Sequence, residues 1–422
     1  MELTQLYQTF LDSTGVSTDT RSLKADQLFF ALRGDNFDGN RFAEKALQKR
    51  AKFVIGDNAD YADLNGFILV EDSLQTLQNL ARYHRQQFVD IPVFALTGSN
   101  GKTTSKELLI QVLATQFRVH ATRGNFNNHI GVPLTLLELK GDTEIAIIEM
   151  GANHQEEIAA LCRIAEPTHG AITNIGTAHL EGFGGQMGIL KGKTELYDFL
   201  DETGGQIFAP AYDGLLQTKM KSYQNPIFWE FQAPIQTEPQ LIYADESGNA
   251  VTTHLFGRFN FYNVLLALAV GKYFGISPEN AHRAISNYVP TNNRSQTIQR
   301  GEQTFLLDAY NANPASMKVA LRSFAHRKAA YRVVILGDML ELGDYEDQKH
   351  QEIYQLAQEL DFERVIFCGE RFGRVVDASD ECYPDFDALQ KGLSENPLSS
   401  NALILLKGSR GMRLERLLQI QN

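Results

Sequence analysis

The residues best suited to carry chemistry lie in one short loop, residues 97–104. The loop reads Thr-Gly-Ser-Asn-Gly-Lys-Thr-Thr, with an apolar run at 93–96 before it and an amphipathic segment after it. A glycine-bearing loop between a strand and a helix turns backbone N–H groups toward a phosphate, and the positive end of the helix favours the same anion. We therefore predict a nucleotide phosphate site made of Gly98, Ser99, Asn100, Gly101, Lys102, Thr103 and Thr104.

Two side chains of this loop have defined parts in such a site. Lys102 would reach the terminal phosphates, and the Thr103 hydroxyl would be a ligand of Mg²⁺. The usual pattern has a further glycine five positions before Gly101, where this chain has Leu96. A plain strand–turn–helix corner is the alternative, although the flanking strand and helix favour nucleotide binding.

Three more polar residues are candidates for the same site. Glu149 ends the apolar run 145–148, and a carboxylate at a strand end opposite a phosphate loop is placed to hold Mg²⁺. The alternative for Glu149 is a solvated strand end. His179 and Lys193 are ambiguous on their own, because a lone histidine is more often structural and a lone helical lysine more often lies on the surface.

Several domains are needed to position these residues, because 422 residues exceed one hydrophobic core and suggest roughly three. We expect a first unit at 1–88, in which short apolar strands alternate with polar helical stretches. It ends where Pro92 stops a helix before the phosphate-loop strand. The second unit is expected at 89–294 and the third at 295–422.

The second unit alternates apolar runs with helical segments, which indicates a parallel sheet covered on both faces. In such sheets ligands bind beyond the carboxyl ends of the strands, and Lys102, Glu149 and segment 174–179 fall at that edge. The third unit has the same α/β pattern. The expected strands of the two units are 93–97, 145–148, 170–175, 305–307, 332–336, 364–367 and 402–406.

Composition narrows the class of protein. A formal net charge of −12 argues against a nucleic-acid partner, although N–H groups and Mg²⁺ can still attract an anionic substrate into a cleft. No apolar run reaches the ~20 residues of a membrane span, and the first residues suggest no signal peptide. The three cysteines have no metal-ligand spacing. We expect a cytoplasmic monomer that contacts neither membrane nor nucleic acid.

A family resemblance covers essentially the whole chain. The motifs that carry it, in order, are STDTR (17–21), DGNRF (38–42), TGSNGKTT (97–104), TRGNFNNHIGVPLTLL (122–137), EMGA (149–152), NIGTAHL (174–180), DAYNANPASM (308–317), LGDMLELG (336–343) and LLKGSRGMRLE (405–415). Together they resemble the Mur ligase family, the ATP-dependent amide ligases of peptidoglycan precursor synthesis. The last three motifs resemble the branch that adds a dipeptide, and the Asp-Asn-Pro-Arg motif of the diaminopimelate-adding branch does not occur.

The resemblance and the patterns together predict an α/β chain of three domains. A central P-loop, parallel-sheet, ATPase-like domain would be flanked by a small N-terminal α/β domain and a Rossmann-like C-terminal domain. The N-terminal domain would bind the UDP end of the acceptor, and the C-terminal domain the incoming dipeptide.

The resemblance also implies roles for the residues of the phosphate edge. Lys102 and Thr103 would hold the ATP phosphates and a first Mg²⁺, Glu149 would lie between two Mg²⁺ ions, and His179 would bind the second. Lys193 matches the lysine that becomes N-carboxylated in this family, and a carbamate is an oxygen ligand suited to Mg²⁺. The alternative for Lys193 is an ordinary ion-pairing lysine.

Further matches extend to the nucleotide and to the other substrates. Asn260 and Asn263 match asparagines on the adenine side, Arg294 an arginine that reaches the γ-phosphate, and Asp308 a carboxylate on the ribose side. Phe259 stands where relatives usually carry histidine. The expected substrate-binding residues are Ser17, Asp19, Arg21, Asn125, Asn127, Asn128, Tyr310, Asn311, Asn313, Lys407 and Arg410.

The expected reaction is the ATP-dependent joining of D-alanyl-D-alanine to UDP-N-acetylmuramoyl-tripeptide through an acyl phosphate. Three alternatives stay open at this point. The chain could be a related ligase that adds a single amino acid, a phosphotransferase with a stable phosphorylated product, or a nucleotide-gated binding module without ligase chemistry.

Overall fold

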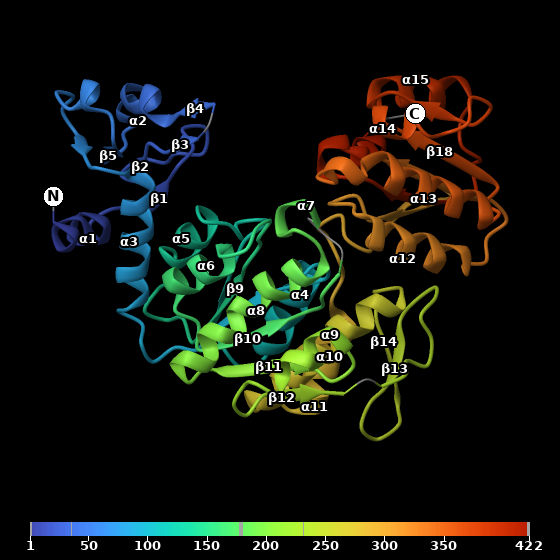
Figure 1. The fold of residues 1–422 in the computed structure, drawn as a ribbon, viewed down its shortest axis with the longest axis horizontal. Coiled ribbons are helices and arrows are strands. Elements are labelled where there is room, and N and C mark those ends of the chain that lie inside the picture. Colours follow the sequence, from blue (N-terminus) through green and yellow to red (C-terminus); the bar gives the residue numbers. More distant parts are fainter. Residues whose placement is uncertain (1, 35, 177–179, 231, 420–422) are drawn as a thin grey trace.

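The chain folds into three α/β units, of which the first and third rise from the same side of the second (Figure 1). The computed structural model describes residues 2–34, 36–176, 180–230 and 232–419. Within those ranges no helix combines the length and the apolar character that crossing a bilayer would require.

The N-terminal unit is built on a four-stranded parallel sheet in the order β1-β2-β5-β6. The apolar runs 28–32, 53–55 and 67–70 predict three of these strands, and the structure has strands within or over them at 28–30, 53–56 and 67–69. The elements are α1 (Leu3–Leu11), β1 (Val16–Ser17), β2 (Leu28–Phe30), β3 (Arg33–Gly34), β4 (Phe37–Asp38), η1 (Gly39–Phe42), α2 (Ala43–Gln48), β5 (Phe53–Gly56), η2 (Ala59–Tyr61), β6 (Phe67–Leu69) and α3 (Ser73–Arg85).

Helix α3 fastens this unit to the central one through a shared apolar core. Leu77 and Leu80 of α3 belong to the same buried cluster as Val132 and Ile158 of the central unit. His84 lies inside the junction, where its Nε2 is 3.1 Å from the Leu139 carbonyl oxygen. Burial lowers the pKa of His84, so the neutral ring is favoured there.

The central unit carries a six-stranded sheet, wholly parallel, in the order β12-β11-β10-β7-β9-β8. Its elements are β7 (Val93–Thr97), α4 (Lys102–Leu113), β8 (Val119–Ala121), α5 (Gly131–Leu136), β9 (Ile145–Glu149), α6 (Glu157–Ala165), β10 (His169–Ile172), α7 (Leu180–Phe183), α8 (Gln186–Thr203), β11 (Gln206–Pro210), α9 (Gly214–Met220), β12 (Ile227–Trp229), β13 (Ile242–Ala244), β14 (Ala250–Thr252), α10 (Arg258–Tyr273) and α11 (Pro278–Asn287).

The apolar runs of this sheet are continuous because helices cover both of its faces (Figure 1). In β7, Ala95 faces the cluster shared with α5, α6 and α8, whereas Phe94 and Leu96 face the cluster shared with α4, α10 and α11. Strand β7 lies between β10 and β9. The connection that follows β7 runs toward β8 at one edge of the sheet, whereas the connection that follows β10 runs toward β11 on the other side. Such a switch point is where open α/β sheets bind ligands.

The C-terminal unit has a six-stranded sheet in the order β15-β16-β20-β17-β18-β19, in which only the β15–β16 pair is antiparallel. Its four predicted strands are confirmed. The elements are β15 (Gln296–Arg300), β16 (Gln303–Leu307), α12 (Pro314–Ala325), β17 (Arg332–Gly337), η3 (Gly343–Tyr345), α13 (Glu346–Glu359), β18 (Arg364–Cys368), α14 (Glu370–Gly373), β19 (Cys382–Tyr383), α15 (Phe386–Glu395), β20 (Leu403–Lys407), η4 (Arg410–Met412) and η5 (Leu414–Gln419).

The contacts between the C-terminal and central units are more polar than those at α3. Phe256 of the central unit packs into the C-terminal apolar core. Beside it, Arg327 donates from Nε to Glu238 Oε2 at 2.7 Å and stacks 4.6 Å from the centre of the Phe256 ring. The domain boundaries predicted at 88/89 and 294/295 remain predictions.

Candidate active site

The phosphate loop depends on two glycines that join β7 to α4. Gly98 has φ +139°, and a Cβ there would lie 2.0 Å from Thr173 Oγ1. Gly101 has φ +82°, and a Cβ there would lie 2.5 Å from Asn263 Oδ1. Any larger residue would therefore clash and would also have to adopt a left-handed backbone, which costs about 1–2 kcal/mol.

A Gly101→Ala substitution is expected to weaken nucleotide binding by roughly tenfold or more, the equivalent of that backbone cost. Titration with a fluorescent ADP analogue measures the effect. Gly141→Ala is the matched control, because a Cβ at Gly141 meets nothing within 4 Å. Equal affinities of the two variants would contradict the argument.

The segment after β10 holds the loop in shape. Asn174 accepts a hydrogen bond from the Asn100 N–H at 3.2 Å and donates to the Asn100 carbonyl at 2.9 Å. The Thr173 hydroxyl donates to the same carbonyl at 2.6 Å, and the Gly176 N–H donates to Ser99 Oγ at 2.9 Å. The strand expected at 170–175 ends at Ile172, and the remaining residues form this support. His179, a predicted metal ligand, lies outside the described residues.

Lys102 lies over the loop and donates from Nζ to the Gly98 carbonyl at 2.5 Å. Burial lowers the pKa of Lys102 to about 8; Glu149 opposes this shift, and Arg294 adds to it. A phosphate is a far stronger partner for an ammonium than a carbonyl, so the side chain is placed to exchange one for the other.

Glu149 meets the loop across the sheet, because β9 pairs with β7 so that Glu149 lies opposite Leu96. Its Oε1 accepts from Thr103 Oγ1 at 3.2 Å and from Asn127 Nδ2 at 2.8 Å. The carboxylate is 1% exposed. Among the described residues its Oε2 has no hydrogen-bond partner.

These oxygen donors fit a small divalent cation. A hydroxyl and a carboxylate at the mouth of a phosphate loop are the ligand types that Mg²⁺ takes, with nucleotide phosphates and water completing its shell. The described residues contain no group of three His, Cys, Asp or Glu side chains that could hold a metal ion without further ligands.

Lys193 projects from α8 into the interior and is 2% exposed. Its Nζ donates to the Ala152 carbonyl at 3.1 Å and lies 4.9 Å from the centre of the Phe183 ring. Burial, reinforced by the nearby charge of Lys102, lowers the pKa of Lys193 well below its usual value. This environment favours a neutral amine, the form that reacts with CO₂.

The two asparagines expected on the adenine side form a buried pair. Asn263 Nδ2 donates to Asn260 Oδ1 at 3.1 Å, and Asn263 Oδ1 accepts from the Ser105 hydroxyl at 3.0 Å. Asn260 Nδ2 donates to the Phe256 carbonyl and to Ser295 Oγ. They thus tie α10 to α4 behind Gly101, and their contact with the base remains a prediction.

Loops of the C-terminal unit reach the same edge. Asn313 donates from Nδ2 to Asn100 Oδ1 at 2.8 Å. The guanidinium carbon of Arg294 is 4.0 Å from the centre of the Tyr310 ring, and that of Arg410 is 5.7 Å from it. Among the described residues, Arg294 Nε is buried without a hydrogen-bond partner. Two cations and a tyrosine thus gather beside the phosphate loop.

Asp308 belongs to the same group of loops. Lys407 pairs with Asp308 through its Nζ and is 1% exposed. The backbone N–H of Ser295 also points to Asp308 Oδ1, at 3.4 Å. Asp308 and Lys407, both predicted to bind substrates, therefore lie in the same place, but in this structure they pair with each other.

Other predicted substrate residues are elsewhere or have structural partners. Asp19 pairs with Arg21 in the N-terminal unit, which lowers the pKa of Asp19, and the backbone N–H of Asp19 donates to Ser17 Oγ. Asn128 accepts from the N–H groups of Ile130 and Gly131 at the start of α5. Asn125 is exposed, and Asn311 Oδ1 accepts from the next backbone N–H.

The sequence patterns missed one residue of this site, Lys106. It is buried one helical turn after Lys102, and its Nζ is 3.8 Å from Glu149 Oε2. The spacing of four residues, on a helix face that is otherwise buried, was the available signal.

A second omission is a network behind Arg410. His350 accepts the Met339 N–H at its Nε2 at 3.0 Å, so its proton must be on Nδ1, 2.7 Å from the Glu346 carbonyl. Ser409 holds the same loop by accepting the N–H of Leu340 at its Oγ.

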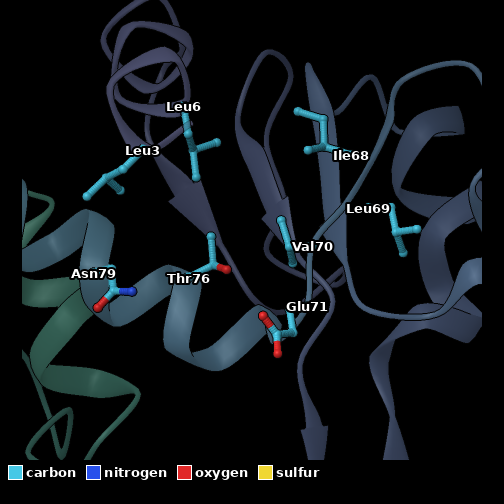
Figure 2. A pocket seen from close by; sticks show the side chains of 8 residues that line it. All are labelled: Leu3, Leu6, Ile68, Leu69, Val70, Glu71, Thr76 and Asn79. Carbon is cyan, nitrogen blue, oxygen red and sulfur yellow. The ribbon is translucent and has the colours of Figure 1, made fainter. Parts of the chain in front are cut away.

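Two cavities lie away from the phosphate loop. One, of about 520 Å³, is lined by side chains of α1, the region of β6, and α3, including Leu6, Ile68 and Thr76 (Figure 2). The other, of about 720 Å³, includes His169 and Gln206 at the amino ends of their strands. Neither of these two cavities includes a residue of the phosphate loop.

Comparisons with known proteins agree with this arrangement. Sequence profiles match in three successive segments: "Mur ligase family, catalytic domain" at residues 12–85, "Mur ligase middle domain" at 96–271, and "Mur ligase, glutamate ligase domain" at 293–410. The UDP-N-acetylmuramoyl-tripeptide–D-alanyl-D-alanine ligase of Bacillus subtilis is 36% identical, over 96% of this chain and 92% of its own. The enzyme of that name from Escherichia coli is 33% identical, with the same coverage.

Solved structures extend the likeness to the fold. The crystal structure of MurF from Acinetobacter baumannii superposes with a TM-score of 0.85 at 28% identity, over 99% of this chain and 97% of that one. The predicted three-domain α/β fold is thereby confirmed. The chain belongs to the Mur ligase family.

Proposed function

We propose that this protein joins D-alanyl-D-alanine to UDP-N-acetylmuramoyl-tripeptide at the expense of ATP, in cytoplasmic peptidoglycan precursor synthesis. Support comes from relatives of that name that align over 96% of the chain. The observation that carries the proposal is that the phosphate loop contacts Glu149 at the carboxyl end of β9, while Lys193 reaches the Ala152 carbonyl just beyond that strand.

In the proposed first step, a carboxylate oxygen of the tripeptide attacks the γ-phosphorus of ATP, and the bond from that phosphorus to the β-γ bridging oxygen breaks. The products are an acyl phosphate and ADP. Lys102 and Arg294 would orient the γ-phosphate and balance its charge, which is the main task of a protein in phosphoryl transfer.

In the second step, the free amine of the dipeptide attacks the acyl carbon. A tetrahedral intermediate forms, the amine loses a proton, and inorganic phosphate leaves. The acyl phosphate hydrolyses readily, so the loops carrying Tyr310 and Asn313 would close over it and exclude water.

Thr103, Glu149 and a carboxylated Lys193 would hold Mg²⁺, with His179 added by the family resemblance. When bound, the ions supply positive charge to the phosphoryl group in transit. Asn260, Asn263 and Asp308 are proposed for the nucleoside, and Ser17, Asp19, Arg21, Asn125, Asn127 and Asn128 for the UDP-linked substrate. Asn311, Lys407 and Arg410 are proposed for the dipeptide. We propose a monomer.

Mass analysis of the products tests the proposal. The protein is incubated with ATP, Mg²⁺, D-alanyl-D-alanine and either the lysine- or the diaminopimelate-containing UDP-tripeptide. One pentapeptide product with stoichiometric ADP and phosphate is expected. Products with single amino acids would indicate a related ligase, a stable phosphorylated acceptor a phosphotransferase, and slow ATP hydrolysis indifferent to both substrates a binding module.

A further inference from the structure

Lys106 is a buried cation that the proposed reaction does not use. Its side chain is 1% exposed, on the face of α4 that also carries Lys102. Its Nζ donates to the Thr122 carbonyl at 2.7 Å and lies 3.4 Å from Glu107 Oε1. A buried ammonium is costly unless nearby charge compensates it, so its place beside Glu149 needs a reason.

The two oxygens of Glu149 have different surroundings. Oε1 faces the phosphate loop and accepts hydrogen bonds from Thr103 and Asn127. Among the described residues Oε2 accepts no hydrogen bond, and it has the Lys106 ammonium at 3.8 Å as its charged neighbour. The backbone is fixed as well, because the Glu149 N–H donates to Thr122 Oγ1 at 2.9 Å while Lys106 holds the Thr122 carbonyl.

We infer that Lys106 determines which divalent ion the site accepts, by reserving Glu149 Oε2 and leaving Oε1 as the single carboxylate oxygen offered to the metal. This inference rests on the proposed divalent-ion site at Thr103 and Glu149. Lys106 would act through Glu149 rather than through contact with substrate or metal, so it is a positioning residue.

The physical basis is the difference between Mg²⁺ and Ca²⁺. Mg²⁺ is small, requires near-octahedral geometry and takes one oxygen from a carboxylate, whereas Ca²⁺ accepts more ligands and often takes both oxygens. A carboxylate whose second oxygen faces a buried ammonium at 3.8 Å offers one oxygen to a metal more readily than two, which disfavours Ca²⁺. Removing the ammonium charge alone would change the affinity for both ions alike, because they carry the same charge.

The test measures the affinity of the full-length protein for a fluorescent ADP analogue in EDTA, in Mg²⁺ and in Ca²⁺. We expect tighter binding in Mg²⁺ than in Ca²⁺ for the unaltered protein. In Lys106→Met, the advantage of Mg²⁺ over Ca²⁺ is expected to shrink by roughly tenfold. Lys106→Arg, which keeps the charge, should retain most of it.

Two further variants keep the test decisive. Lys106→Gln retains a donor for the Thr122 carbonyl and replaces the methionine variant if that one does not fold. Glu107→Gln alters the other carboxylate near Lys106. The Glu107 side chain is 31% exposed, and its substitution should leave the advantage of Mg²⁺ over Ca²⁺ unchanged.

The possible failures are distinguishable. If Mg²⁺ does not tighten nucleotide binding to the unaltered protein, the proposed metal site itself is wrong. If Mg²⁺ does so but the neutral variants discriminate as the unaltered protein does, only the inference about Lys106 is overturned. Equal losses in both ions would also overturn it, because they indicate a structural role alone.

Discussion

Replacing Lys102 with methionine is expected to lower kcat/KM for ATP by roughly 10³-fold, the size of effect seen when one preorganised charge-stabilising donor is lost. The side chain already lies over the loop, bonded to the Gly98 carbonyl, and methionine has similar length without the charge. Steady-state kinetics with both substrates saturating measures the change. Retention of a tenth or more of the activity would exclude Lys102 from charge stabilisation.

The pH dependence of nucleotide binding gives an independent check on Lys102. Its pKa is lowered to about 8, so the free protein loses the ammonium as the pH rises through that value. ADP should therefore bind more weakly above pH 8, by up to about tenfold per pH unit. The Lys102→Met variant should lack this dependence. The effect of Lys102 on the free energy of unfolding has the opposite sign. Between about pH 8 and 10.5 the unfolded chain binds more protons than the folded protein, so the folded protein becomes more stable as the pH rises through that range.

The second large effect is expected at Lys193. Burial lowers the pKa of Lys193 and so favours the neutral amine, whose nitrogen can bond to the carbon of CO₂ and release a proton to give a carbamate. Lys193→Met is expected to reduce kcat by roughly 100-fold or more, since it would remove the carbamate that we propose as a charged metal ligand. Activity of the unaltered protein should fall in CO₂-depleted buffer and return with bicarbonate.

A spectroscopic measurement separates a carbamate from an ordinary lysine. Incubation with ¹³C-bicarbonate should give a carbamate carbonyl signal in the unaltered protein and none in Lys193→Met. Lys191→Met is the matched control, because Lys191 lies on the same helix and is exposed. A full signal in Lys193→Met, or activity indifferent to CO₂, would contradict carboxylation.

Much of the fold could be predicted because its signals are local. Continuous apolar runs predicted the inner strands β7, β9 and β10, and both faces of these strands are indeed buried. The hairpin β13–β14 was missed, since each strand has only three residues and most of them are partly or fully exposed, so that no continuous buried apolar run marks it. Its burial depends on Tyr243, whose hydroxyl meets His282 from a distant helix at 2.9 Å.

Residues of the candidate site could be predicted from the sequence where a motif is compatible with only one chemical role. Gly101 and Lys102 are such cases, because the loop needs a left-handed residue and a cation. The role of an asparagine is harder to predict, since its amide can either cap a helix or bind a ligand or another side chain. Asn128 accepts a hydrogen bond from the backbone at the start of α5, whereas Asn127 donates to Glu149. Which of the two occurs depends on tertiary neighbours that the sequence does not reveal.

The interface of the central unit with α3 is apolar, whereas its interface with the C-terminal unit is more polar. This difference has a consequence for how substrates enter. Separating α3 from its neighbours would expose buried apolar side chains to water, and the free-energy cost of that exposure holds the N-terminal unit in place. On the C-terminal side, the Arg327–Glu238 and Asn313–Asn100 contacts can be replaced by hydrogen bonds to water. The apolar packing of Phe256 is lost there as well, against the larger shared cluster at α3. Opening and closing of the proposed active site is therefore expected to move the C-terminal unit, while the N-terminal unit, which we propose binds the UDP-linked substrate, keeps its place.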